Sequence, residues 1–191
     1  MTALGVLAVA GVGGWALWSA EEPAVAVPDR VCQEMVPSTQ VKSLLPERGE
    51  AFEQASSNFV PDSAKGLGSC ELTGGGKTIN IRYGMIQAAD FTLDSVTRDA
   101  TEPGKTPLSL GPAKGYLREA GGSLLVACPY EKGRNDLLDV SVGVEGLPDT
   151  KDGATTKEIA ALTADVARAV AREVENCEGA DELPDTAPEI G

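Results

Sequence analysis

Four cysteines constrain this chain more than any other feature of its sequence: Cys32, Cys70, Cys128 and Cys177. None forms a C-x-x-C pair, which argues against a zinc ribbon and against a thioredoxin-type redox site. In an exported domain an even number of cysteines indicates disulfides, and four cysteines allow three pairings. Their order along the chain favours Cys32–Cys70 and Cys128–Cys177, each joining a predicted helix to a predicted strand. We therefore expect two structural disulfides.

An uncharged apolar segment at residues 2–20 fits with export. At about 1.5 Å per residue it would cover roughly 28 Å as a helix, close to the hydrocarbon thickness of a bilayer. Trp15 and Trp18 lie near its end, where indole rings favour the membrane interface. We expect residues 1–20 to anchor the chain in the cell membrane, with the remainder outside the cytoplasm.

A second interpretation of the N-terminus remains open. The tripeptide Ala24-Val25-Ala26 has the small-x-small form that signal peptidases accept, so cleavage near Ala26 would secrete the domain instead. No cysteine closely follows the apolar run, which argues against a lipid-modified cysteine. In either case the rest of the chain is expected outside the cytoplasm.

The composition excludes several function classes. The formal net charge of −13 does not favour binding to nucleic acid, which needs clustered lysines and arginines. The chain has no histidine, so it has neither a Ser-His-Asp nor a Cys-His arrangement and no histidine-bearing metal site. Because only 4% of its residues are aromatic, the core must be mainly aliphatic.

The rest of the chain divides into a Pro/Ala linker at residues 21–28, a domain at 29–177 and an acidic, proline-bearing tail at 178–191 that we expect to be disordered. Two short helices, capped by Asp29 and Ser38, are expected to open the domain. The next stretch, residues 47–66, is mixed and polar and is predicted to be an irregular loop.

Alternating apolar and polar runs predict strands in the middle of the domain, at residues 67–73, 77–86, 114–120, 123–130 and 137–145. Residues 88–100 fit a strand or a short helix, and residues 101–112 form a Pro/Gly loop. A helical stripe closes the domain: Ile159, Leu162, Val166, Val170, Val174 and Cys177. The predicted fold class is α+β: an antiparallel sheet of about five strands with the N- and C-terminal helices packed on one face, preceded by a single transmembrane helix.

The stretch Gly76-Lys77-Thr78 resembles the end of a phosphate-binding loop. That loop needs a first glycine where this chain has Glu71, and a helix where residues 79–86 alternate as a strand. We therefore interpret the glycines before Lys77 as a hairpin turn and expect no nucleotide binding.

Carboxylate pairs are the only candidates for acid–base chemistry: Asp136 with Asp139, and Asp149 with Asp152. Both pairs fall in or beside predicted turns, where acids are common for local reasons. A calcium loop at 149–153 is disfavoured because Pro148 stands where the first ligand is needed. We assign no catalytic, cofactor-binding or metal-binding residue.

Arginines and tyrosines offer a weaker signal. Three arginines could converge on an anionic ligand across the sheet, although we favour the simpler explanation that they occupy solvated strand and turn positions: Arg82, Arg118 and Arg134. Three tyrosines are expected to anchor sheet edges or the core: Tyr83, Tyr116 and Tyr130.

The order of "VCQEMVPSTQVKSLL", then "GSCELTGGGKTINIRYG", then a C-terminal helix ending in cysteine resembles small actinobacterial envelope proteins and lipoproteins of unknown function, including the DUF3558-like group. It is also similar in order to the extracellular sensor domains of some mycobacterial-type kinases. The resemblance covers roughly residues 30–177 and implies an envelope-facing α+β domain. It carries over no catalytic residue.

These observations favour a non-enzymatic extracytoplasmic domain, tethered to the cell membrane through residues 2–20, that binds a small ligand or a protein partner in the envelope. A carboxylate-based hydrolase acting on cell-wall material is one alternative. Another is a structural accessory subunit of a membrane complex.

Overall fold

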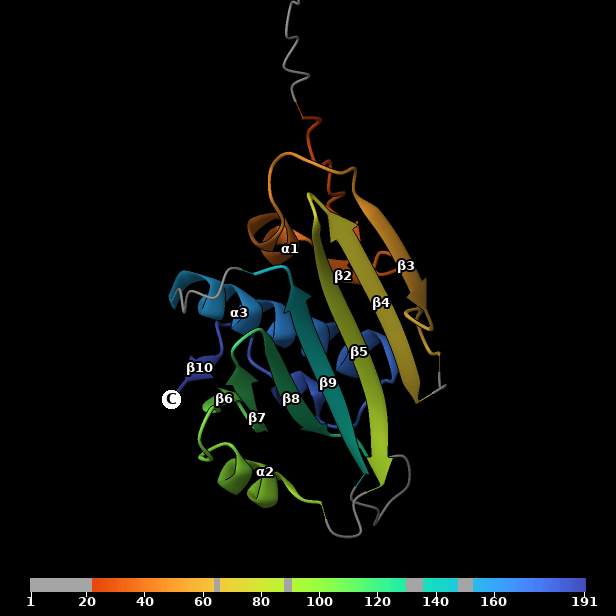
Figure 1. The fold of residues 1–191 in the computed structure, drawn as a ribbon. Helices are drawn as coiled ribbons and strands as arrows, with labels where there is room; N and C mark the ends of the chain where they lie inside the picture. Colours follow the sequence, from red (N-terminus) through yellow and green to blue (C-terminus); the bar gives the residue numbers. More distant parts are fainter. Residues whose placement is uncertain (1–21, 64–65, 88–90, 130–135, 148–152) are drawn as a thin grey trace, which may run out of the picture.

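The computed structural model describes residues 22–63, 66–87, 91–129, 136–147 and 153–191. Within these residues, an eight-stranded antiparallel sheet runs in the order β10-β6-β7-β8-β9-β5-β4-β3 (Figure 1). Its strands are β3 (Glu53–Ser57), β4 (Leu67–Gly74), β5 (Lys77–Gln87), β6 (Thr106–Leu110), β7 (Ala113–Arg118), β8 (Gly121–Ala127), β9 (Asp136–Glu145) and β10 (Glu189–Ile190).

The prediction of about five strands is wrong because three strands come from segments interpreted as loop or tail. β3 lies in the expected irregular loop, β6 in the expected Pro/Gly loop and β10 in the expected disordered tail. β3 and β10 show no clear alternation of apolar and polar residues, and in β6 the alternation is limited to Leu108, Ser109 and Leu110. Each pairs with a neighbour at or near a sheet edge, so pairing across the sheet, rather than local sequence, makes them strands.

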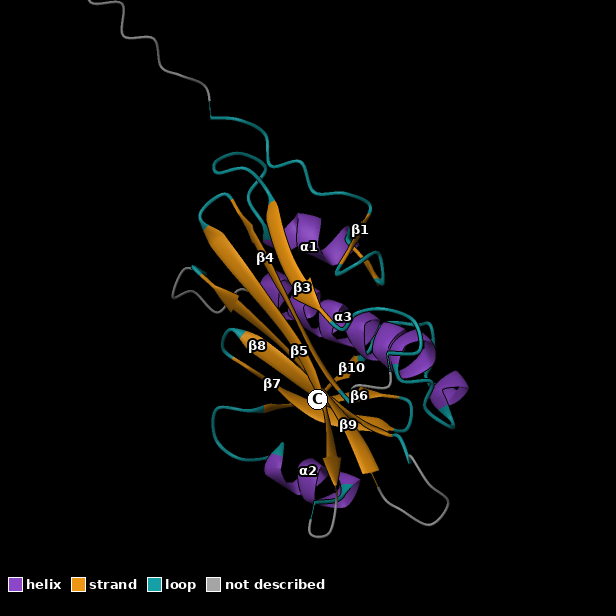
Figure 2. Cartoon of the chain, turned by 90° about the vertical axis from the view of Figure 1, so that its right-hand side faces the viewer, coloured by secondary structure: helices purple, strands orange, loops and turns teal. Residues whose placement is uncertain are grey.

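One face of the sheet, here called the inner face, is covered by α1 (Thr39–Leu44) and α3 (Gly153–Ala169) (Figure 2). A π-helical turn, η1 (Val170–Val174), continues α3. The predicted stripe on this helix is buried from Ile159 to Cys177. The inner face thus holds the main aliphatic core.

A third helix, α2 (Leu93–Asp99), packs on the opposite face, here called the outer face. Val96 joins Leu125 of β8 and Leu137 of β9 in a small second cluster. Thr92 and Ser95 begin α2 with a reciprocal capping box. In the described ranges no other helix packs on the outer face, so helices cover the inner face far more completely.

Of the two short helices expected at the start of the domain, the second is confirmed as α1, which follows Ser38, and the prediction of the first is wrong. Residues 30–37 form a two-stranded hairpin, β1 (Arg30–Val31) with β2 (Val36–Pro37). Three consecutive residues of its turn have positive φ: Cys32 at 54°, Gln33 at 56° and Glu34 at 66°. Left-handed backbone is unfavourable for such residues, and tertiary bonds hold it here.

Those bonds come from three directions. The backbone N–H of Cys32 donates to Oε1 of Gln54 at 3.1 Å. The side chain of Gln33 accepts from the N–H of Phe59 at 2.9 Å. The Cys32–Cys70 disulfide ties the turn to β4. Local sequence favoured a helix, but these distant contacts stabilise the hairpin instead.

Both disulfides have the pairing that the sequence favoured. Cys32–Cys70 closes a sequence separation of 38 residues, and Cys128–Cys177 closes one of 49. The first joins the β1–β2 turn to β4, and the second joins the residue after β8 to the end of the helical segment. Each disulfide therefore links the inner layer to the sheet.

The two flanking segments pack on the domain. In the linker, Val25 donates its N–H to the carbonyl of Glu47 at 2.9 Å, and Gly49 donates to the carbonyl of Pro23 at 3.0 Å. The tail expected to be disordered contains η2 (Ala180–Glu182) and β10, and Leu183 is buried. Buried side chains and backbone bonds outweigh its acidic, proline-bearing composition.

The predicted transmembrane helix at residues 2–20 lies outside the described residues. Among the helices of the described ranges, none has the length and apolar character needed to cross a membrane.

Candidate functional site

The glycine turn at residues 74–76 is the first candidate to be placed. β4 and β5 pair directly on either side of it, from Gly74 opposite Lys77 onward, so the predicted hairpin is confirmed. Gly75 and Gly76 have φ of +59° and +77°, which glycine adopts without strain. The Lys77 ammonium donates to the carbonyl of Leu44, in the last turn of α1, at 3.3 Å. Lys77 therefore satisfies a backbone carbonyl at the C-terminal end of α1.

The carboxylate pair of β9 is divided between the two faces of the sheet. Asp136 is buried on the inner side, and Asp139 projects to the outer side because the two positions differ by three, an odd number, on one strand. Burial raises the pKa of Asp139, and a hydrogen bond from Ser123 Oγ at 2.9 Å partly offsets that effect. The second predicted pair, Asp149 with Asp152, lies outside the described residues, as does Pro148.

The tyrosines have separate roles. Tyr83 is buried, donates its hydroxyl to the carbonyl of Asn58 at 2.6 Å and meets the Phe59 ring edge-on at 5.2 Å. Tyr116 lies on the outer face, and Tyr130 lies outside the described residues. Tyr83 thus anchors the core, as the sequence predicted for this class of side chain.

The most distinctive polar arrangement is a cross-strand row on the outer face. The registers place six residues side by side, one from each of six adjacent strands: Ser57, Ser69, Arg82, Ser141, Ser123 and Tyr116. We call this set the serine row. At about 4.8 Å per strand, it extends roughly 24 Å. Hydroxyls both donate and accept hydrogen bonds, so the row presents a line of adaptable polar groups.

Arg82 supplies the charge in the middle of the serine row. Its side chain is exposed, and within the described part of the chain it forms no ion pair. On the same strand, Asn80 Nδ2 donates to Glu145 Oε1 at 3.1 Å, so this carboxylate bonds to Asn80. A guanidinium with five donors is thus available on an open surface.

A shallow hollow of about 390 Å³ surrounds this arginine. Its outer-face lining includes Ser57, Ser69, Glu71, Asn80 and Arg82. The hydroxyls of Ser57 and Ser69 are 3.2 Å apart, so they hold each other in place. The hollow combines one cation, one carboxylate, one amide and two hydroxyls.

The far end of the serine row is cationic. Lys105 Nζ and the Arg118 guanidinium lie 4.7 and 5.0 Å from the centre of the Tyr116 ring. Lys105 is also paired with Glu102 at 2.8 Å. Both cations are close enough for cation–π attraction to the Tyr116 ring.

The arginines do not converge on one point. Arg82 lies on β5 and Arg118 on β7, three strand spacings away, or roughly 14 Å. A single carboxylate could not bridge them, although an extended ligand could reach both. Arg134 lies outside the described residues.

Metal binding has no support within the described ranges, where no three acidic or cysteine side chains gather closely enough to hold an ion. Comparison of the chain with protein-family models, curated proteins and solved structures finds no match.

Proposed function

We propose that this chain is an exported, non-enzymatic domain that binds a ligand of the cell envelope on the outer face of its sheet. The serine row carries this proposal, because a line of hydroxyls around a guanidinium with no ion pair among the described residues suits a ligand rich in hydroxyl groups that also bears a carboxylate. Arginine pairs with carboxylates through two parallel hydrogen bonds. Serine hydroxyls match sugar-like hydroxyls because both groups donate and accept.

The net charge refines the ligand class. A chain with a net charge of −13 repels a densely charged polyanion at long range. We therefore propose an extended glycan with few, spaced carboxylates, which short-range contacts to Arg82 could hold. The two disulfides and the apolar segment at residues 2–20 support an address outside the cytoplasm.

The hydrolase alternative is the weaker one. Acid–base hydrolysis of a glycan needs two carboxyl groups facing one cleft, about 5–10 Å apart. Asp136 and Asp139 point to opposite faces of β9, so this predicted pair does not provide them.

Binding to soluble peptidoglycan fragments, which carry hydroxyls and carboxylates, tests the proposal. We expect isothermal titration calorimetry with the full oxidised chain to show binding that Arg82→Ala weakens at least tenfold. Arg98→Ala, which removes an exposed arginine on α2, is the matched control and should bind as the parent does. Equal binding by the parent and Arg82→Ala, or no binding by the parent, would refute the proposal.

A further inference from the structure

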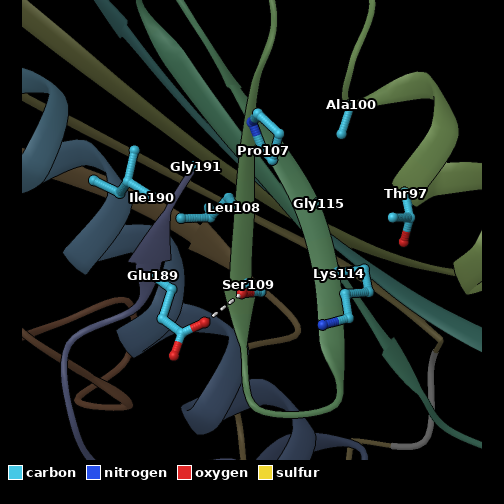
Figure 3. A pocket seen from close by; sticks show the side chains of 10 residues that line it. All are labelled: Thr97, Ala100, Pro107, Leu108, Ser109, Lys114, Gly115, Glu189, Ile190 and Gly191. Carbon is cyan, nitrogen blue, oxygen red and sulfur yellow. Dashed lines mark hydrogen bonds between the residues drawn. The ribbon is translucent and has the colours of Figure 1, made fainter.

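The edge of the sheet at β6 is covered by the chain's own C-terminal residues. β10 pairs with β6 through only two residue pairs, Glu189 with Ser109 and Ile190 with Leu108. Gly191 adds one further bond by donating its N–H to the carbonyl of Pro107 at 3.0 Å. Figure 3 shows Ser109 and Glu189 joined across this pair, with Lys114 on the neighbouring strand. The pairing of β10 with β6 therefore extends over very few residues.

The preceding part of the tail is held separately. Arg168 and Arg172, one turn apart on the α3–η1 helix, donate to four backbone carbonyls of the tail: Ala180, Leu183, Pro184 and Thr186. Arg172 also pairs with Asp185 at 2.8 Å. Because these bonds end at Thr186, residues 187–191 can leave β6 while the rest of the tail stays attached.

Space remains around the seated tail. Ile190 borders two hollows, one of about 280 Å³ beside Pro107 and Lys114 and one of about 490 Å³ against Ala160 and Ala161 of α3. Ile190 as a whole residue is 38% exposed. An isoleucine therefore does not fill the site, and a larger apolar side chain would bury more surface there.

The backbone of β6 can pair with an added strand. The carbonyl of Pro107 points toward β10, and residues two apart on a strand point the same way, so the N–H and carbonyl of Ser109 do too. Proline has no N–H to leave unpaired, which is why it is tolerated on this side. β6 thus offers three backbone groups at its outer edge.

The side chains beside β6 favour an acidic residue in the strand that pairs with it. Ser109 Oγ donates to the Glu189 carboxylate at 3.4 Å, and Lys114 lies opposite Ser109 on β7. Lys114 forms no ion pair among the described residues. A carboxylate opposite Ser109 would meet both a hydroxyl donor and a nearby ammonium.

We infer that the β6 edge is a strand-addition site for an extended segment of a partner protein, occupied by residues 187–191 until that segment displaces them. The segment carries a large apolar residue opposite Leu108 and an acidic residue opposite Ser109. Added strands gain affinity from main-chain bonds and specificity from alternate side chains. This site is separate from the serine row, and it stands whether or not the outer face binds a glycan.

Competition with the tail provides the test. The probe is a fluorescent peptide of residues 186–191, Thr-Ala-Pro-Glu-Ile-Gly, together with a version carrying Ile190→Phe. In the full chain, Ile190→Asp should release the tail and tighten peptide binding at least tenfold in fluorescence anisotropy, because it removes a competitor present at high effective concentration. The Ile190→Phe peptide should bind severalfold more tightly than the native one. Val60→Asp changes another exposed apolar residue and should bind as the parent does.

Two further measurements keep the inference falsifiable. In the Ile190→Asp chain, the Ser109 amide should exchange faster with deuterium, and added peptide should restore its protection. Adding Ser109→Pro should weaken peptide binding at least tenfold. Peptide binding no tighter in Ile190→Asp than in the parent would overturn the inference. A doubled mass of Ile190→Asp in light scattering would assign the edge to a second copy instead.

Discussion

The two faces of the sheet differ although they belong to the same strands. On β5, Ile81 is fully buried against the inner layer, and the next residue, Arg82, is exposed on the outer face. The inner face is aliphatic and bonded covalently to the layer that covers it. Away from α2, the outer face carries serines, charges and glycines. Packing therefore dictates the inner residues, and the outer residues are free to serve recognition.

Among the variants that test the difference between the two faces, removal of a disulfide should have the largest effect on stability. Replacing both cysteines of one bridge, Cys128→Ser with Cys177→Ser, should lower the free energy of unfolding by about 4 kcal/mol, because the open chain regains the freedom of a long loop. Denaturant titration checks this value. Ser141→Ala on the outer face is the control and should change stability by less than about 0.5 kcal/mol. A loss under about 1 kcal/mol for the double variant would show that the bridge does not hold the inner layer.

Adjacent residues on β5 offer a direct contrast. Ile81→Ala should lower the unfolding free energy by about 3 kcal/mol, since it leaves a cavity in the core. Arg82→Ala should alter it by less than about 0.5 kcal/mol while reducing glycan binding. Chemical denaturation of the two variants side by side measures the difference. Equal losses would mean that Arg82 has a structural role and that the outer face is not free of packing demands.

Two glycines sharpen the contrast further. A Cβ on Gly122 would lie 2.6 Å from Thr163 Oγ1 of α3, so Gly122→Ala should cost about 1–3 kcal/mol through overpacking. A Cβ on Gly143 would meet no atom within 4 Å, so Gly143→Ala should be neutral or stabilising by under about 1 kcal/mol. Thermal melts compare the two. A larger loss for Gly143→Ala would reverse the assignment of the faces.

The smallest effect concerns Asp139 on the outer face. Burial raises its pKa in the folded state, so protonation favours folding: the contribution is complete below the ordinary pKa near 3.8 and is lost as pH rises through the raised value. Asp139→Asn should therefore be the more stable chain at pH 7, by under about 1 kcal/mol, and should lose this advantage near pH 3.5. Unfolding curves at both pH values test the sign. An advantage that grows at low pH would contradict it.

Local sequence patterns predicted the helices and strands that have a complete apolar face. The stripe from Ile159 to Cys177 specified α3, and alternation specified β4, β5 and β9, because each has a complete apolar face of its own. The order of the cysteines also favoured the correct bridges. Short polar segments such as β3 and β10 carry no such pattern, since their partners lie elsewhere in the chain.

The serine row shows the same limit at the level of the site. Along β4, β8 and β9 the serine lies between residues that face the inner layer, and the alternation of apolar and polar residues can reveal such a position. Their alignment depends on the pairing of β5 with β9, whose residues are far apart in the chain. Arg82 was therefore identified as a candidate, but its hydroxyl neighbours could be recognised only once the strand order was known.

The two bridges follow one another along the polypeptide without interleaving. When such a chain is exported with its N-terminus first, Cys70 is the first partner available to Cys32, because Cys128 has not yet been exported. Oxidation in order of emergence thus produces the native pairing directly, with no need for the slow thiol–disulfide exchange that corrects mismatched bridges. Maturation of this protein should accordingly depend on an oxidant far more than on an isomerase.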